Sequence, residues 1–182
     1  VRDRAPAYYV YRQRMGDHVQ TGIVAGASVA EYDNGTIKKH EKTRPNKEDD
    51  RTLHLDALNA QTGPVFLTYR AQPAIDKLVA EVTSQSPDVD FVADDGIGHT
   101  LWVLNQSSKV DALRGAFAKV PALYIADGHH RSASASRVSA SRTGRGAHSF
   151  FLSVTFPDNQ MKILDYNRVV FDLNGLTEEQ LL

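Results

Sequence analysis

The stretch YIADGHHRSASAS (residues 124–136) joins two segments of different character. Its first half completes a continuous apolar run, residues 122–126, which predicts a short strand buried on both faces. Asp127 and Gly128 follow as a turn, and residues 130–142 have the length of a helix but only a weak apolar stripe. The pattern predicts a strand-turn-helix junction with nitrogen-rich side chains at the start of the helix.

Strand and helix signals alternate on both sides of this junction. Three β-hairpins are predicted from paired runs rich in β-branched and aromatic residues, at residues 7–15 with 21–32, 90–94 with 99–105, and 149–156 with 160–166. Helices are predicted at 47–61, 73–84 and 109–120, a further strand at 63–70, and turn, short extended piece and loop at 33–46. This order indicates an α+β (mixed α/β) fold with a mainly antiparallel sheet and several short helices.

The composition of the 182 residues is that of a globular domain, with 41% hydrophobic and 24% charged residues. The 21 Lys and Arg residues against 22 Asp and Glu argue against a dedicated nucleic-acid binder, so nucleic acid is not an expected partner. Cysteine is absent, which excludes disulfides, thiolate chemistry and cysteine-based zinc sites. No apolar run approaches the length of a membrane span and no signal peptide opens the chain, so we expect a cytoplasmic protein without a membrane partner.

Both ends of the sequence predict a fragment of a longer protein. The chain begins without methionine, and it stops soon after Thr177, where a helix start is expected. We found no internal repeat, low-complexity tract or linker, so residues 1–182 are expected to form a single domain.

The junction after residue 126 has the features of an anion site. A helix start presents free backbone N–H groups with partial positive charge, and a glycine such as Gly128 lets a phosphate approach the backbone. Arg131 adds a planar fork that matches phosphate oxygens, and His129 and His130 can donate hydrogen bonds or move protons near neutral pH. The small residues at 132–136 would let the helix lie close to the sheet or to a ligand.

Two other interpretations of the junction stay open on residue types alone. Adjacent histidines point in different directions and rarely share a metal ion, so no direct metal ligand is expected, although Asp127 could reach a Mg²⁺ held by phosphates. Alternatively, Asp127 caps the helix, Gly128 supplies the turn, and the basic side chains are solvated.

A second polar cluster lies upstream in KKHEKTR (residues 38–44). Glu41 could act as a general base with His40 and Thr43 as polar neighbours, although a solvated charged loop is favoured on chemistry alone. Asn167 and Arg168, after a predicted strand, are candidate ligand contacts or loop-fixing residues. Trp102 is a candidate stacking surface for a base or sugar, although core packing is the commoner role.

The chain resembles the middle of the bacterial and archaeal domain-of-unknown-function family numbered one thousand and fifteen. The resemblance covers nearly the whole chain, through YYVYRQ, QTGIVAGASV, IKKHEKTRP, NAQTGPVFLTY, YIADGHHR and FLSVTFPDNQMKILDYNRVVFDLNGL. Its most specific pieces are HEKT (40–43) and DGHHR (127–131), which occur in the same order in free serine kinases of the ParB/sulfiredoxin-like fold. The chain departs from those kinases at Ser132 and Ala133, where they carry a bulky residue.

The resemblance implies a ParB/sulfiredoxin-like core and a nucleotide cradle. The implied phosphate and nucleotide ligands are Asp127, Gly128, His129, His130 and Arg131, to which we add Arg168 as a predicted contact. Glu41 matches the position of the base that deprotonates a serine hydroxyl, and we predict catalytic roles for Glu41 and His130.

The implied reaction is phosphoryl transfer from ATP or ADP to free serine or a similar small hydroxyl compound, with Mg²⁺ neutralising charge on the transferred group. A non-catalytic nucleotide-binding regulatory module is the alternative. A DNA-binding role, known in other members of that superfamily, fits the near-neutral charge least well.

Overall fold

The computed structural model describes residues 7–144, 146–165, 167 and 169–181. Its strands are β1 (Tyr8–Met15), β2 (His18–Ser28), β3 (Ile37–Lys38), β4 (Val65–Tyr69), β5 (Val89–Val92), β6 (Gly98–Leu104), β7 (Leu123–Asp127) and β8 (Phe150–Pro157). Its helices are α1 (Val29–Asp33), α2 (Pro45–Leu58), α3 (Pro73–Thr83), α4 (Ser107–Phe117), α5 (His129–Ser141) and α6 (Glu178–Leu181), with 3₁₀ turns at Ala147–Ser149 and Asp158–Gln160.

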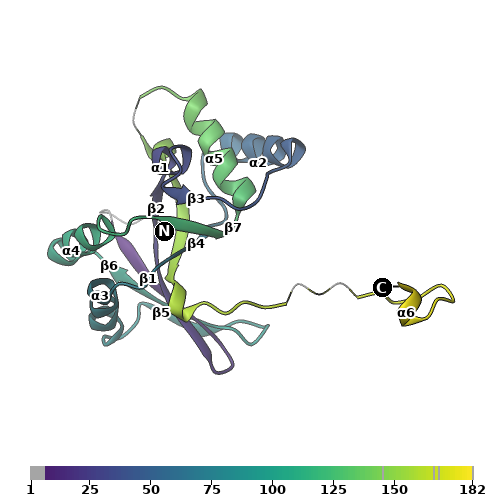
Figure 1. Ribbon diagram of the computed structural model, residues 1–182. Coiled ribbons are helices and arrows are strands. Elements are labelled where there is room, and N and C mark those ends of the chain that lie inside the picture. Colours follow the sequence, from purple (N-terminus) through teal and green to yellow (C-terminus); the bar gives the residue numbers. More distant parts are fainter. Residues whose placement is uncertain (1–6, 145, 166, 168, 182) are drawn as a thin grey trace.

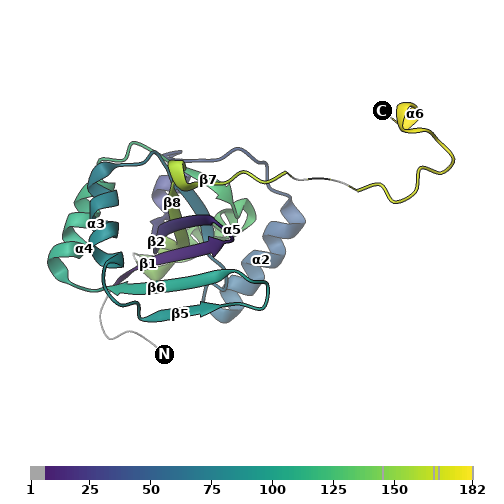
Figure 2. The ribbon, with the colours of Figure 1, turned by 90° about the horizontal axis from the view of Figure 1, so that it is seen from below.

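All eight strands belong to one sheet, in the order β3-β7-β4-β8-β2-β1-β6-β5. Neighbouring strands are antiparallel except for the parallel pairs β3–β7 and β4–β8. Figures 1 and 2 show α3 and α4 at one end of the sheet and α1, α2 and α5 at the other. The predicted mixed α/β fold with a mainly antiparallel sheet is therefore confirmed.

The core divides into two apolar clusters that share β4. Val65 and Leu67 on this strand pack with α1 and α5, whereas Tyr69 packs with α3 and α4. The three side chains alternate with less buried ones, as expected when one face of a strand is covered. The same face of β4 therefore supplies both clusters.

The hairpin signals at the beginning and in the middle of the chain are confirmed. Strands β1 and β2 pair up to Met15 and His18, and β5 and β6 pair up to Val92 and Gly98. The run predicted as a strand over 21–32, however, ends at Ser28. The Ser28 hydroxyl accepts a hydrogen bond from the backbone N–H of Glu31 and caps α1, so residues 29–33 are helical.

The third predicted hairpin is wrong. Strand β8 is flanked by β4 on one side and β2 on the other, so both of its edges are already paired. Residues 158–160 form a 3₁₀ turn, and residues 161–165 are not a strand. The chain from Met161 onward leaves the sheet and leads to α6 (Figure 1).

The prediction that residues 122–126 are buried on both faces is also wrong. Within β7, Ile125 is buried, while Tyr124 and Ala126 on the opposite face are exposed. The neighbour of β7 on one side is the two-residue β3, so β7 lies almost at the edge of the sheet.

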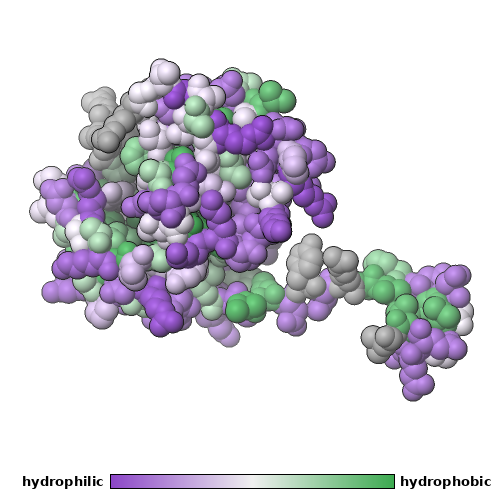
Figure 3. Space-filling model, turned by 45° about the horizontal axis from the view of Figure 1, so that its top comes forward, coloured by the Kyte–Doolittle hydropathy of each residue, from purple (hydrophilic) through white to green (hydrophobic). Residues whose placement is uncertain are grey.

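The segment beyond β8 exposes apolar side chains. Ile163 and Phe171 are each 95% exposed, and Figure 3 shows green, hydrophobic atoms in the part of the chain that extends from the domain. Among the described residues, no helix is long and apolar enough to cross a membrane.

Candidate functional site

The junction quoted first is a strand-turn-helix unit, as predicted. Strand β7 ends at Asp127, Gly128 adopts φ +100°, and α5 begins at His129. A Cβ on residue 128 would approach Arg131 Nη2 to 2.9 Å, so glycine serves both the left-handed backbone and the close approach of this guanidinium. The backbone N–H groups of residues 129–131 meet no hydrogen-bond acceptor in the described part of the chain. These donors are free to bind an anion.

Small side chains let α5 pack closely, which confirms the expectation for residues 132–136. Ser132 is fully buried, and its hydroxyl donates to the backbone oxygen of His129 at 3.1 Å. The Ser134 hydroxyl donates to the backbone oxygen of Glu48 on α2 at 3.2 Å. Hydrogen bonds to backbone thus accompany the packing of a helix that has no strong apolar stripe, and they hold its first turn in place.

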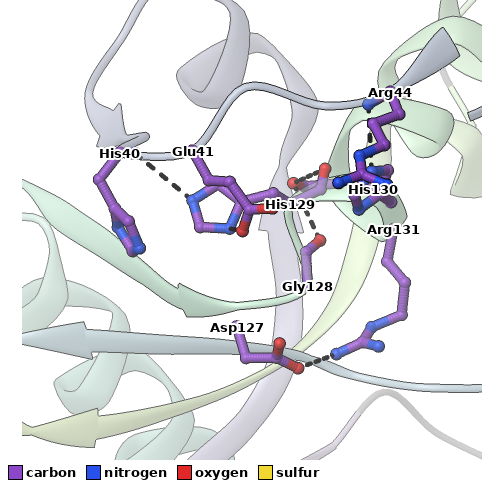
Figure 4. Close-up of polar contacts among 9 residues, drawn as sticks. His40, Glu41, Arg44, Asp127, Gly128, His129, His130 and Arg131 are labelled. Carbon is purple, nitrogen blue, oxygen red and sulfur yellow. Dashed lines mark hydrogen bonds and ion pairs between the residues drawn. The ribbon is translucent and has the colours of Figure 1, made fainter. Parts of the chain in front are cut away.

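The parallel pairing of β3 with β7 brings the second motif to this helix start. Ile37 pairs with Leu123 and Lys38 with Tyr124, so the residues that follow both strands emerge at the same end. The backbone N–H of His40 donates to Nε2 of His129 at 3.4 Å, across 89 residues of sequence. HEKT and DGHHR are therefore neighbours in space, as Figure 4 shows.

His129 lies at the site with its side chain buried. Its side chain is 4% exposed, and Nδ1 is 3.5 Å from Oε2 of Glu41. Since Nε2 accepts from the His40 N–H, the neutral ring carries its proton on Nδ1, facing Glu41. Burial, with a further contribution from His40, lowers the pKa of His129 from its usual value, although Glu41 and Asp127 act in the opposite direction.

The two residues after His129 have different partners. Nε2 of His130 accepts a hydrogen bond from the backbone N–H of Arg44 at 3.1 Å. Arg131 folds back over Gly128, and its Nη2 donates to Oδ2 of Asp127 at 2.7 Å (Figure 4). Nε of Arg131 is buried without a hydrogen-bond partner. The guanidinium therefore lies next to the free N–H groups and has donor capacity left.

A mainly polar cleft of about 560 Å³ opens over this junction. Its lining residues are Glu41, Lys47, Asp50, Arg51, Asp127, Gly128, His129, His130 and Arg131. Arg51 and Arg131 also line a smaller adjoining cavity of about 150 Å³ between α2, α5 and residues 60–63. Candidate base, helix start and cations thus share one cleft.

Three cleft residues were missed by the sequence analysis: Lys47, Asp50 and Arg51 of α2. They lie at spacings of three and four residues, so they share one helix face. That spacing was the signal that could have found them.

Several predicted contacts lie elsewhere. Trp102 is buried in the cluster beneath α3 and α4, donates from Nε1 to the Gln85 oxygen at 2.9 Å, and is covered by Arg12. It is therefore a core residue and not a stacking surface. The Thr43 hydroxyl donates to the Glu48 carboxylate and so fixes the start of α2.

Of the two candidates after β8, Asn167 is not among the residues that line the cleft. Asn167 is exposed in the segment beyond the sheet. Arg168 lies outside the described residues.

No group of three or more His, Cys, Asp or Glu residues that could hold a metal ion occurs among the described residues. The Asp127 carboxylate is at the cleft but paired with Arg131. Single carboxylates of this kind suit a Mg²⁺ that keeps water and phosphate as its other ligands, and they do not form a dedicated cage.

Comparison with known proteins gives one family. The model of the family described as "Protein of unknown function (DUF1015)" matches residues 1–182. No curated protein and no solved structure matches the chain.

Proposed function

Because the chain belongs to the DUF1015 family of proteins of unknown function, its activity must be inferred from its own site, and we propose that it is a nucleotide-dependent kinase for a small hydroxyl compound. The proposed donor is ATP or ADP, and the proposed acceptor is free serine. The proposal includes a ParB/sulfiredoxin-like core, supported by the glycine turn between β7 and α5. A soluble nucleotide donor and amino-acid acceptor favour a cytoplasmic location.

One observation carries this proposal: Glu41 lines the same cleft as the open N-terminus of α5. Phosphoryl transfer needs little covalent chemistry from the protein. It needs hydrogen-bond donors that hold the phosphates, and beside them a base that accepts the proton of the acceptor hydroxyl. The free N–H groups of residues 129–131 and the guanidinium of Arg131 supply the first. The carboxylate of Glu41, 58% exposed, supplies the second.

In the proposed reaction the hydroxyl proton of the acceptor passes to Glu41 as the hydroxyl oxygen attacks the terminal phosphorus. The bond from that phosphorus to the bridging oxygen breaks, and ADP or AMP leaves. Arg131, Lys47 and the α5 N–H groups stabilise charge on the phosphates. His130 lies at the same cleft and is available to a phosphate oxygen or a proton.

Mg²⁺ would supply charge neutralisation between the phosphates. Asp127 or Asp50 would provide a carboxylate for an ion that arrives with the nucleotide. For Asp127 this requires its ion pair with Arg131 to open. Arg131 then turns toward the phosphates. Opening this one ion pair therefore frees Asp127 for Mg²⁺ and Arg131 for the nucleotide.

Phosphoserine formation tests the proposal directly. The protein is incubated with serine, Mg²⁺ and either ATP or ADP, and O-phosphoserine is measured by mass spectrometry. Glu41→Gln is expected to lower the rate by about 10²–10⁴-fold, the usual contribution of a positioned base, while nucleotide binding persists. Glu81→Gln, the same change at an exposed residue of α3, is the matched control and is expected to keep the wild-type rate.

Other outcomes would favour the alternatives. Nucleotide binding without phosphoserine from either donor would overturn the serine assignment. If Arg131→Met removed binding while Glu41→Gln left cellular function intact, a regulatory nucleotide-binding module would replace the kinase. Binding to duplex DNA at physiological salt would support the DNA-binding alternative.

A further inference from the structure

The buried ring of His129, which belongs to the second motif, meets His40 and Glu41 of the first motif through its two nitrogens. We infer that His129 is a positioning residue that orients the Glu41 carboxylate, rather than a ligand of the nucleotide phosphates. This inference rests on the proposed role of Glu41 as a base. It separates His129 from Gly128, His130 and Arg131, with which the sequence had grouped it.

The first argument is that each ring nitrogen already faces a protein group. Nε2 accepts the His40 N–H at 3.4 Å, and Nδ1 lies 3.5 Å from Oε2 of Glu41. A neutral imidazole has one donor and one acceptor: the His40 N–H uses the acceptor, and the donor on Nδ1 faces Glu41. A phosphate could bind the ring only by displacing one of them.

The second argument is rigidity. Glu41 is more than half exposed, on a loop that contains no regular structure after β3, and such a side chain has many rotamers. His129 is buried in the first turn of α5, and the ring of His40 packs edge-on against it, with centroids 4.4 Å apart. A fixed N–H donor restricts the mobile carboxylate and leaves its second oxygen for the acceptor hydroxyl.

Burial is the main reason that the ring is neutral. His40 and His130 disfavour a proton on His129, Glu41 and Asp127 favour one, and burial is the largest influence, against protonation. A neutral ring matters because only that form accepts from the His40 N–H while donating to Glu41. The backbone N–H of residue 129 stays available to an anion, so the cradle and the ring have separate tasks.

A spectroscopic test does not depend on activity. Long-range ¹H–¹⁵N NMR of the histidine-labelled protein at neutral pH reports which ring nitrogen carries the proton, and the His129 signal is identified by its loss in His129→Asn. We expect the proton on Nδ1. A proton on Nε2, or a charged ring at neutral pH, overturns the inference whether or not the protein makes phosphoserine.

A kinetic test compares two substitutions of His129, by asparagine and by glutamine, whose side-chain amides lie at different distances from the backbone. Asparagine places its N–H near the position of Nδ1, whereas glutamine places its amide near Nε2 and leaves Glu41 without its donor. We expect His129→Gln to lower kcat by roughly 10–100-fold, as for other residues that orient a functional side chain, and His129→Asn to recover most of it. The nucleotide KM should stay within about twofold in both variants, because the ring contacts no phosphate.

The neighbouring residue provides the control. His130→Asn is expected to change the nucleotide KM, since His130 is the histidine proposed to face the phosphates. If His129→Gln instead raised the nucleotide KM at unchanged kcat, His129 would be a phosphate ligand and the inference would fail. If the wild-type protein made no phosphoserine, the proposed function would fail, and the NMR result would still decide how His129 and Glu41 are linked.

Discussion

Helices α3 and α4 pack on the sheet through Ile75, Val82 and Leu113. Helix α5 joins the other apolar cluster through the small residues Ala133 and Ala135, and Val138 is a larger buried apolar residue on the same helix. The first pair buries large apolar side chains around Trp102. Helix α5 buries Ser132, whose hydroxyl bonds to backbone oxygens of its own first turn. The two ends of the molecule therefore reach a packed core by different means.

The difference shows how structure and function are divided in this fold. Large apolar side chains contribute stability in proportion to the area they remove from water. Small ones contribute less, but they allow the backbones of α2 and α5 to approach and fix the position of Gly128 and the N–H groups after it. We expect changes near α4 to affect stability, and changes in α5 to affect ligand binding as well.

The largest effect is expected at Leu113, which is 1% exposed. Leu113→Ala removes apolar contacts and leaves a cavity, so it should lower the free energy of unfolding by about 2–5 kcal/mol. Urea titration measures this loss. Below the unfolding transition, nucleotide affinity should equal that of the wild type, and a lower affinity of the folded variant would contradict the division between the two ends.

An intermediate effect is expected from enlarging the α5 contact. Ala133→Leu places extra atoms in a packed face and should cost about 1–3 kcal/mol. The helix must move to accommodate the larger side chain, and this movement displaces the N–H groups at the start of α5. The folded variant should therefore also bind nucleotide more weakly. Ala140→Leu makes the same change on the exposed side of α5 and should shift stability by no more than about 0.5 kcal/mol, with binding unchanged. Equal affinities in both variants would contradict the comparison.

A smaller effect is expected from pH. The pKa of His129 is lowered in the folded protein, so below about pH 6.5 the unfolded chain binds a proton that the folded chain does not. The contribution of His129 to the free energy of unfolding is therefore fully present above that pH, and it is lost as the pH falls toward the lowered pKa of the folded protein. Urea titrations at pH 5–8 should show this loss in the wild type and a flatter dependence in His129→Asn. Parallel curves would contradict it.

The sequence predicted one part of the candidate site, the junction between β7 and α5. Asp127, Gly128 and Arg131 form the strand-turn-helix junction that local chemistry indicates, since a glycine turn before a helix can be identified from neighbours in sequence. Glu41 was a candidate base from its polar neighbours and from its motif, but nothing within KKHEKTR shows which distant helix it faces. Lys47 and Arg51 were missed, because a charged helix face looks the same whether it borders solvent or a cleft.

The sequence by itself determined that β1 pairs with β2, that β5 pairs with β6, and that a glycine turn separates β7 from α5. These features depend on contacts between near neighbours along the chain. Only the tertiary structure decided that β8 has no hairpin partner, since β4 and β2 occupy both of its edges. It alone also decided that the parallel pairing of β3 with β7 places His40 and Glu41 against His129, a contact across 89 residues that no local pattern specifies.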